Sequence, residues 1–97
     1  MINVQSLKVD GKTCLGLKVE LPDSPPLLLA IAEKGFIMCG FLNIDTAEKL
    51  GVAAAVVSGV ESFEDVLATQ IKAATSKAKT LGINPGMEGI EAIKHMF

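Results

Sequence analysis

The sequence contains no arginine, tryptophan or tyrosine, and these absences exclude several kinds of binding surface. Nine lysines stand against eleven carboxylates, so the net charge is −2 and the electrostatic basis for binding nucleic acid or an anionic membrane is missing. With four phenylalanines as its only aromatic residues, the chain also lacks the platforms on which bases stack. We therefore expect neither a nucleic acid nor a membrane among its partners.

Cysteine and histidine are scarce as well. The two cysteines, Cys14 and Cys39, lie in apolar segments typical of strands, and their spacing with the single histidine, His95, matches no metal site. We expect no metal, no other cofactor and no disulfide framework. The apolar runs are too short to span a bilayer, and the first twelve residues lack the features of a signal peptide. These absences together predict a cytoplasmic protein.

The chain is rich in apolar residues, which make up 49% of its 97 positions. That length predicts one domain over residues 1–97. A domain of about 100 residues buries only about 65% of its unfolded surface, so an apolar-rich one often completes its burial against another copy. We expect a homo-oligomer.

Residues 1–21 predict a β-hairpin, because two alternating segments flank Asp10-Gly11, a pair that suits a two-residue type I′ turn. With Val9 opposite Lys12, one face of the hairpin gathers most of its apolar side chains, and we interpret that face as the core face. Its members are Ile2, Val4, Leu15, Leu17, Val19 and Leu21. Leu7, Val9 and Cys14 cluster on the opposite face, where we predict the oligomer interface.

The remaining chain predicts more strands and then helices. Residues 27–34 and 35–43 predict a second hairpin around Gly35, after a proline-rich turn. Asp45 and Glu48 have the spacing of a capping box, which predicts a short helix over residues 46–50 ending at Gly51. Residues 52–58 are compatible with a buried strand or a helix fragment, and their valines favour the strand.

A long helix is predicted from Ser62 to Leu81, with apolar residues at helical spacing and a stop at Gly82. A turn at residues 84–86 and a short helix over residues 87–97 follow. Strands first and helices later indicate an α+β two-layer sandwich, in which the hairpins form a mainly antiparallel or mixed sheet with helices on one side.

Cys39 lies at the centre of the segment "GFIMCGFLNID" and has two interpretations. In a strand covered on both faces a thiol packs as a small apolar group, whereas a nucleophile needs a cation, a helix N-terminus or a histidine nearby. Packing is the favoured interpretation, and a thiol nucleophile or redox thiol is the alternative. The neighbouring Gly40 indicates a bulge or a close backbone approach, so both residues are candidates for the wall of a ligand site.

A second candidate site lies in the segment "GINPGMEGIEAIK", where Asn84, Gly86 and Gly89 precede the last helix. Free backbone N–H groups at such a helix start can bind an anion, although turns of this composition usually serve only to reverse the chain. His95 lies four residues after Glu91 at the end of that helix, which predicts an exposed side-chain pair.

Three segments together resemble the YunC-like family, a domain of unknown function found in small bacterial and archaeal proteins. They are "GFIMCGFLNID", Gly59-Val60 before the predicted long helix, and "LGINPGMEGIEAIKHM" near the end. The resemblance implies an α+β fold and an N-terminal β region that assembles the protein into a tetramer. It supplies no reaction, cofactor or catalytic residue. The sequence is thus interpreted as a structural or small-ligand-binding homo-oligomeric domain, with an enzyme or redox protein that uses Cys39 as the alternative.

Overall fold

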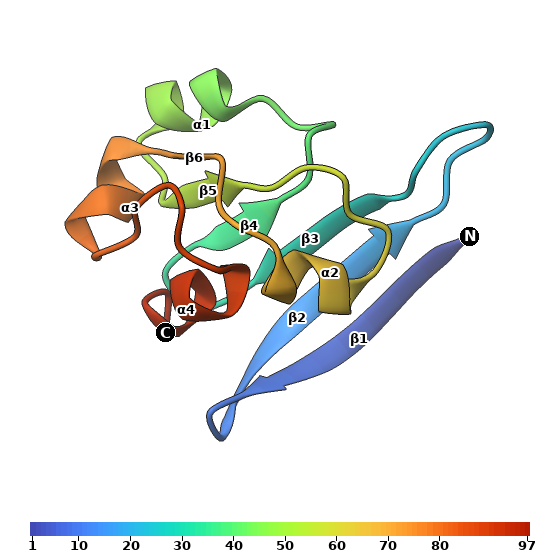
Figure 1. The fold of residues 1–97 in the computed structure, drawn as a ribbon, viewed down its shortest axis with the longest axis horizontal. Helices are drawn as coiled ribbons and strands as arrows, with labels where there is room; N and C mark the ends of the chain where they lie inside the picture. The colour runs from blue at the N-terminus through green and yellow to red at the C-terminus, as the bar shows by residue number, and fades with distance from the viewer.

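The computed structural model describes all 97 residues as one six-stranded sheet with four short helices (Figure 1). The strands follow the order of the chain across the sheet: β1 (Ile2–Val9), β2 (Lys12–Val19), β3 (Leu27–Ile31), β4 (Phe36–Met38), β5 (Ala54–Val56) and β6 (Ala73–Ala74). The helices are α1 (Ile44–Leu50), α2 (Phe63–Ala68), α3 (Ser76–Thr80) and α4 (Gly89–Lys94). All neighbouring strands are antiparallel except β4 and β5, which are parallel. The predicted α+β class and mixed sheet are confirmed, and none of the helices has the length and apolar character needed to cross a membrane.

The predicted first hairpin is present in the predicted register. Asp10 and Gly11 both have positive φ, 54° and 78°, as a type I′ turn requires. Val9 pairs with Lys12 and Leu7 with Cys14. The second predicted hairpin, β3 with β4, and the strand interpretation of residues 52–58 are confirmed as well.

The two faces of the hairpin have the opposite roles to those predicted. Leu7, Val9 and Cys14 are buried in the main core, whereas the predicted core residues Ile2 and Val4 are 68% and 61% exposed. We call the face with Leu7, Val9 and Cys14 the inner face and the other the outer face. Gly16 of β2 explains why α2 packs on the inner face. A Cβ at Gly16 would come within 2.8 Å of the Phe63 ring of α2. Because glycine has no side chain, α2 can pack closely against the inner face at this point.

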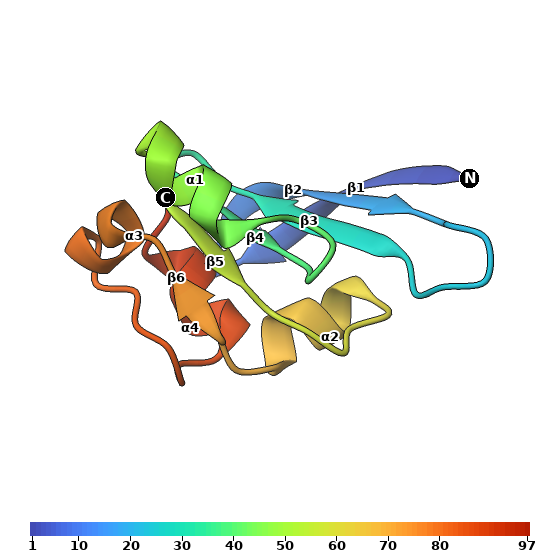
Figure 2. The same ribbon diagram turned by 90° about the horizontal axis from the view of Figure 1, so that it is seen from above.

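Helices cover both sides of the sheet rather than one. Figure 2 shows α1 on one side and α2 with α4 on the other. The inner face carries the main core, to which α2 contributes Val66 and α4 contributes Ile93. The outer face is covered only over β4 and β5, where Ala47 of α1 packs on Met38 and Ala54. The outer face of β1, β2 and β3 has no helix over it.

The predicted long helix from Ser62 to Leu81 is interrupted. Ser62 does cap α2, since its side chain accepts from the Asp65 N–H, but α2 ends at Ala68 and a short strand separates it from α3. Thr75 accounts for the break, because its buried Oγ1 accepts from the Ala54 N–H at 3.1 Å and donates to the Val52 carbonyl at 2.7 Å. These tertiary hydrogen bonds hold the segment against β5, and they override a helical pattern in the sequence.

Candidate functional site

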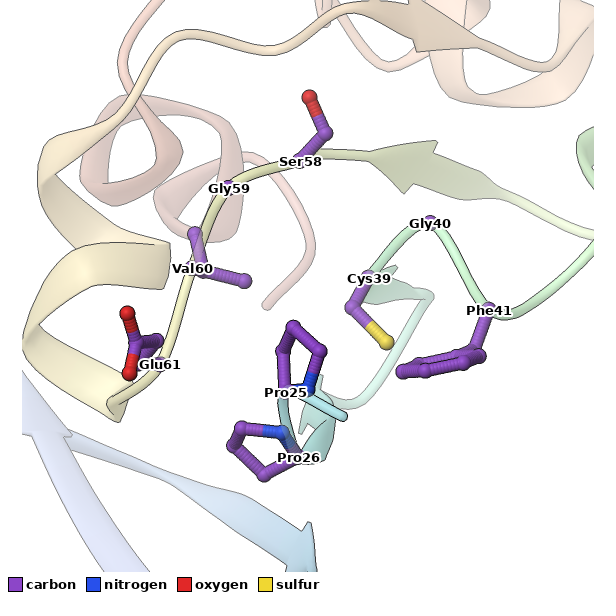
Figure 3. A pocket seen from close by; sticks show the side chains of 9 residues that line it. All are labelled: Pro25, Pro26, Cys39, Gly40, Phe41, Ser58, Gly59, Val60 and Glu61. Carbon is purple, nitrogen blue, oxygen red and sulfur yellow. The ribbon is translucent and has the colours of Figure 1, made fainter. Parts of the chain in front are cut away.

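A cavity of about 270 Å³ opens beside β4 and β5 (Figure 3). It draws on three segments that are far apart in the sequence: the turn before β3, the loop after β4 and the loop after β5. The lining residues are Pro25, Pro26, Cys39, Gly40, Phe41, Ser58, Gly59, Val60 and Glu61. We call this the Cys39 pocket.

The Cys39 pocket lies at the carboxyl ends of the only two parallel strands. β4 leads directly into Cys39-Gly40-Phe41, and β5 leads through Val57 into Ser58-Gly59-Val60. Because α1 connects β4 to β5, this unit is a strand-helix-strand crossover whose two following loops leave from one edge of the sheet. In sheets with parallel strands, ligands bind in the crevice outside those carboxyl ends. The topology therefore puts the cavity where such sites form.

The Cys39 side chain has a structural role at the base of the pocket. Its thiol is buried, and Sγ accepts a hydrogen bond from the Leu28 N–H at 3.3 Å. The Cys39 carbonyl is not available to Leu28 because the chain turns there, and that carbonyl accepts from the Leu42 N–H at 3.2 Å. Sulfur thus satisfies a buried strand amide that would otherwise have no acceptor. Figure 3 shows Sγ among Pro25, Pro26 and Phe41, so the same atom also faces the cavity.

This hydrogen bond gives a prediction for Cys39. Cys39→Ala leaves the buried Leu28 N–H without an acceptor, which costs about 1–3 kcal/mol, whereas Cys39→Ser keeps an acceptor of similar size. We expect the serine variant to be the more stable of the two in urea unfolding. An equal loss of stability in both variants would contradict the role given to the N–H···S bond. Packing alone would then account for the presence of cysteine at this position.

Gly40 does not have the close backbone approach that its position in the sequence suggested. A Cβ placed on Gly40 meets no heavy atom within 4 Å, and Gly40 is exposed at the pocket. A side chain is therefore tolerated there, and the interpretation of Gly40 as a tight contact is wrong. The close approaches lie elsewhere, at Gly16, Gly35 and Gly89.

Few groups that could activate the thiol line the pocket. Neither the histidine nor any lysine lines it, and Glu61 is its only charged residue. The His95 ring lies against Gly82, so the structure does not bring His95 into the pocket, and the salt bridge of Glu91 is with Lys94 at 3.4 Å rather than with His95. No group of three His, Cys, Asp or Glu side chains is placed to hold a metal ion. Besides Cys39 itself, Glu61 is thus the only titratable side chain that lines the pocket.

The helix starts on either side of the pocket are already capped by their own side chains. At α1, Asn43 Oδ1 accepts from the N–H groups of Asp45 at 2.7 Å and Thr46 at 3.3 Å. At α2, Asp65 Oδ2 accepts from the Glu61 N–H at 3.0 Å, and Ser62 Oγ accepts from the Asp65 N–H at 3.1 Å. These amides are therefore occupied and offer nothing to an anion.

The predicted anion site before α4 does not form. The Gly86 N–H donates to the Ile71 carbonyl and the Gly89 N–H to the Thr69 carbonyl, both at 2.8 Å. Gly89 is buried, and neither glycine nor Asn84 lines the Cys39 pocket. The amides on which the prediction depended instead fasten α4 and its preceding turn to the segment after α2.

The predicted oligomer interface is also corrected. Leu7, Val9 and Cys14 are 8%, 2% and 4% exposed within a single chain, so they have no surface left for a second copy. Burial raises the pKa of the Cys14 thiol, as expected for a cysteine in the core. The exposed apolar residues of the hairpin lie on the outer face instead, at Ile2, Val4 and Leu15.

Most of the pocket lining was not predicted from the sequence. Cys39 and Gly40 were, but Pro25, Pro26, Phe41 and residues 58–61 were not. One signal was available in "VVSGVES", where a buried strand runs into a glycine with φ of 71° just before a helix cap. Such a turn at a strand end is a recognisable position for a site once β4 and β5 are known to be parallel.

Comparison with known proteins assigns the chain to a family. A family model described as a domain of unknown function (DUF1805) matches residues 38–96, which include seven of the nine pocket residues. The chain belongs to this family. The uncharacterized protein YunC of Bacillus subtilis (strain 168) is 30% identical to it over 102 residues, which covers 100% of this chain and 99% of that protein. The predicted resemblance is confirmed.

The fold has a solved counterpart. The crystal structure of a protein of unknown function from Thermoplasma acidophilum matches with a TM-score of 0.94 and 34% identity, over 100% of this chain and 94% of that one. The match therefore extends over the first hairpin as well as the region covered by the family model. One of these proteins is described as uncharacterized and the other as having an unknown function. The comparisons therefore show the fold of the family and name no reaction.

Proposed function

We propose that this protein is a small-ligand-binding domain that works as a homo-oligomer, and that the ligand occupies the Cys39 pocket. The observation that carries the proposal is the position of the pocket at the carboxyl ends of the parallel strands β4 and β5. A cavity of about 270 Å³ suits a compact metabolite, and its proline, valine and phenylalanine side chains provide the apolar contact that most ligand sites have.

Assembly is the second part of the proposal, and it uses the outer face of the hairpin. Six apolar side chains lie on this face of β1, β2 and β3 without a helix over them: Ile2, Val4, Leu15, Leu17, Val19 and Ile31. Exposed apolar patches of this kind mark protein interfaces, and β1 adds an open sheet edge beside the patch. We propose that copies bury this patch against one another, as a tetramer. The cytoplasm is the proposed location, because both cysteines are free and a reducing compartment keeps them so.

A fragment screen tests ligand binding. We expect some compact fragments to raise the melting temperature of the protein, because a ligand that binds only the folded state stabilises it by mass action. Phe41→Ala should reduce or remove these shifts, since its ring lines the pocket and is 52% exposed. Leu50→Ala is the matched control, an exposed apolar residue on α1 outside the pocket. Equal shifts in melting temperature for the parent, Phe41→Ala and Leu50→Ala would indicate that the fragments bind outside the Cys39 pocket and would contradict the proposal.

A thiol reaction at Cys39 is the second candidate function. It is favoured by the position of the buried Sγ at the cavity. It ranks second because no histidine or lysine lines the pocket to activate the thiol. Cys39→Ser separates the two functions: it should retain ligand binding, whereas a reaction at sulfur would be lost.

A further inference from the structure

We infer that the Cys39 pocket selects ligands by charge, accepting small organic cations with an apolar ring and rejecting anions. This inference rests on the proposed binding function and names the ligand class for the same site. Three observations carry it: the charge of the lining, the state of the neighbouring helix starts, and the positions of Phe41 and Glu61.

The lining has one charged group, and that group is negative. Glu61 has an exposed side chain, and no salt bridge or side-chain hydrogen bond involves its carboxylate. Glu64 and Asp65 follow it at the start of α2, so the charged side chains on this side of the pocket are negative. A carboxylate without a cationic partner attracts a positive ligand and repels a negative one.

Four backbone N–H groups at the neighbouring helix starts are occupied by side chains of the protein. Asn43 accepts from the Asp45 N–H and the Thr46 N–H at the start of α1, while Asp65 accepts from the Glu61 N–H and Ser62 from the Asp65 N–H. An anion that bound the Glu61 N–H would have to displace the Asp65 carboxylate from it. An anion at any of these four amides therefore competes with a cap that the protein itself supplies.

Phe41 and Glu61 are arranged for a ligand with two different ends. Figure 3 shows them on opposite sides of the pocket, with Pro25, Val60 and Cys39 between them. An apolar ring can contact Phe41 and the proline side chains, while an ammonium group attached to the ring reaches toward Glu61. A cation placed over the Phe41 ring would also gain from the negative face of that ring.

Three probes of one shape test the inference: benzylamine, which is positive at neutral pH, benzyl alcohol, which is neutral, and benzoate, which is negative. We expect benzylamine to bind about tenfold more tightly than benzoate, with benzyl alcohol between them, because one carboxylate near a unit charge supplies an interaction of this order. Amide chemical shifts measured at increasing probe concentration give the dissociation constants. The shifts should be centred on residues 39–41 and 58–61.

Two variants decide whether Glu61 is responsible. Glu61→Gln should reduce the ratio of the benzoate and benzylamine dissociation constants to about twofold, because it removes the negative charge. The dissociation constant of benzyl alcohol should stay the same. Glu64→Gln is the matched control, since Glu64 is exposed and does not line the pocket. Glu64→Gln should retain most of the difference between the dissociation constants of benzylamine and benzoate.

The outcomes separate this inference from the proposed function. Benzoate binding as tightly as benzylamine, with shifts at the pocket, would overturn the charge selection and leave ligand binding intact. A preference for benzylamine that survives Glu61→Gln would also overturn it. Shifts centred away from residues 39–41 and 58–61, or no binding by any probe, would overturn both.

Discussion

Gly89→Ala should destabilise the protein severely, although it adds a single methyl group. A Cβ at Gly89 would collide with the Val66 carbonyl oxygen and crowd the Leu67 Cα, both of which belong to the backbone of α2. Backbone atoms cannot rotate away, so α4 must move, and the hydrogen bond from the Gly89 N–H to Thr69 is strained or lost. Overpacking in a core costs about 1–3 kcal/mol and more where the neighbour is rigid.

Gly40→Ala is the matched control, because its new methyl group meets nothing within 4 Å and the residue is exposed. We expect it to change the free energy of unfolding by no more than about 0.5 kcal/mol, as most surface substitutions do. Denaturant unfolding of both variants measures the difference. Similar midpoints for the two variants would show that α4 adapts to Gly89→Ala, and would contradict a close contact between α4 and the backbone of α2.

Turns and helix ends that are determined by a few neighbouring residues could be predicted from the sequence. The Asp10-Gly11 turn fixes its own register, because the turn type and the strand pairing are set by neighbouring residues. The cap at Ser62 and the helix stop at Gly51, which has φ of 73°, are of the same kind. Each of these features depends on no more than a few residues of chain.

The choice of the core face depended on an element distant in the sequence. Both faces of the first hairpin carry apolar residues, and the face with more of them was expected to be buried. The helices cover the other face, where Gly16 leaves room for Phe63, a residue 47 positions later. The glycine in β2 was visible in the sequence, but its meaning requires knowing which helix lies over it.

The site was predictable only in part for a related reason. Cys39 and Gly40 stood out because they interrupt an apolar strand, but their partners in the pocket come from the turn before β3 and the loop after β5. The turn before β3 lies beside Cys39 because β3 pairs with β4, and the loop after β5 lies there because β4 and β5 are parallel. A parallel pair joins residues that local periodicity cannot connect. The break between α2 and α3 has a similar origin, since Thr75 hydrogen-bonds to Val52 and Ala54 across 23 and 21 positions.

The inner and outer faces of β1 should respond in opposite ways to the same substitution. Val9 is 2% exposed on the inner face, and Val9→Glu both loses the burial of an apolar side chain and places a carboxylate in the core. The first loss is about 1.5–3 kcal/mol, and an unpaired buried charge adds several more. Because a domain of this kind is stable by only about 5–15 kcal/mol, we expect Val9→Glu to be largely unfolded in circular dichroism.

Val4→Glu carries the same change to the outer face, five residues earlier on the same strand. Val4 is 61% exposed in the single chain, so the substitution should leave the fold of the monomer intact. If copies bury the outer face against one another, each interface gains like charges where apolar contact was, and the assembly should separate into smaller species. Light scattering coupled to size-exclusion chromatography measures the mass. A folded Val4→Glu protein with the mass of the parent oligomer would show that the outer face is not the interface, and a monomeric parent would refute the proposed assembly directly.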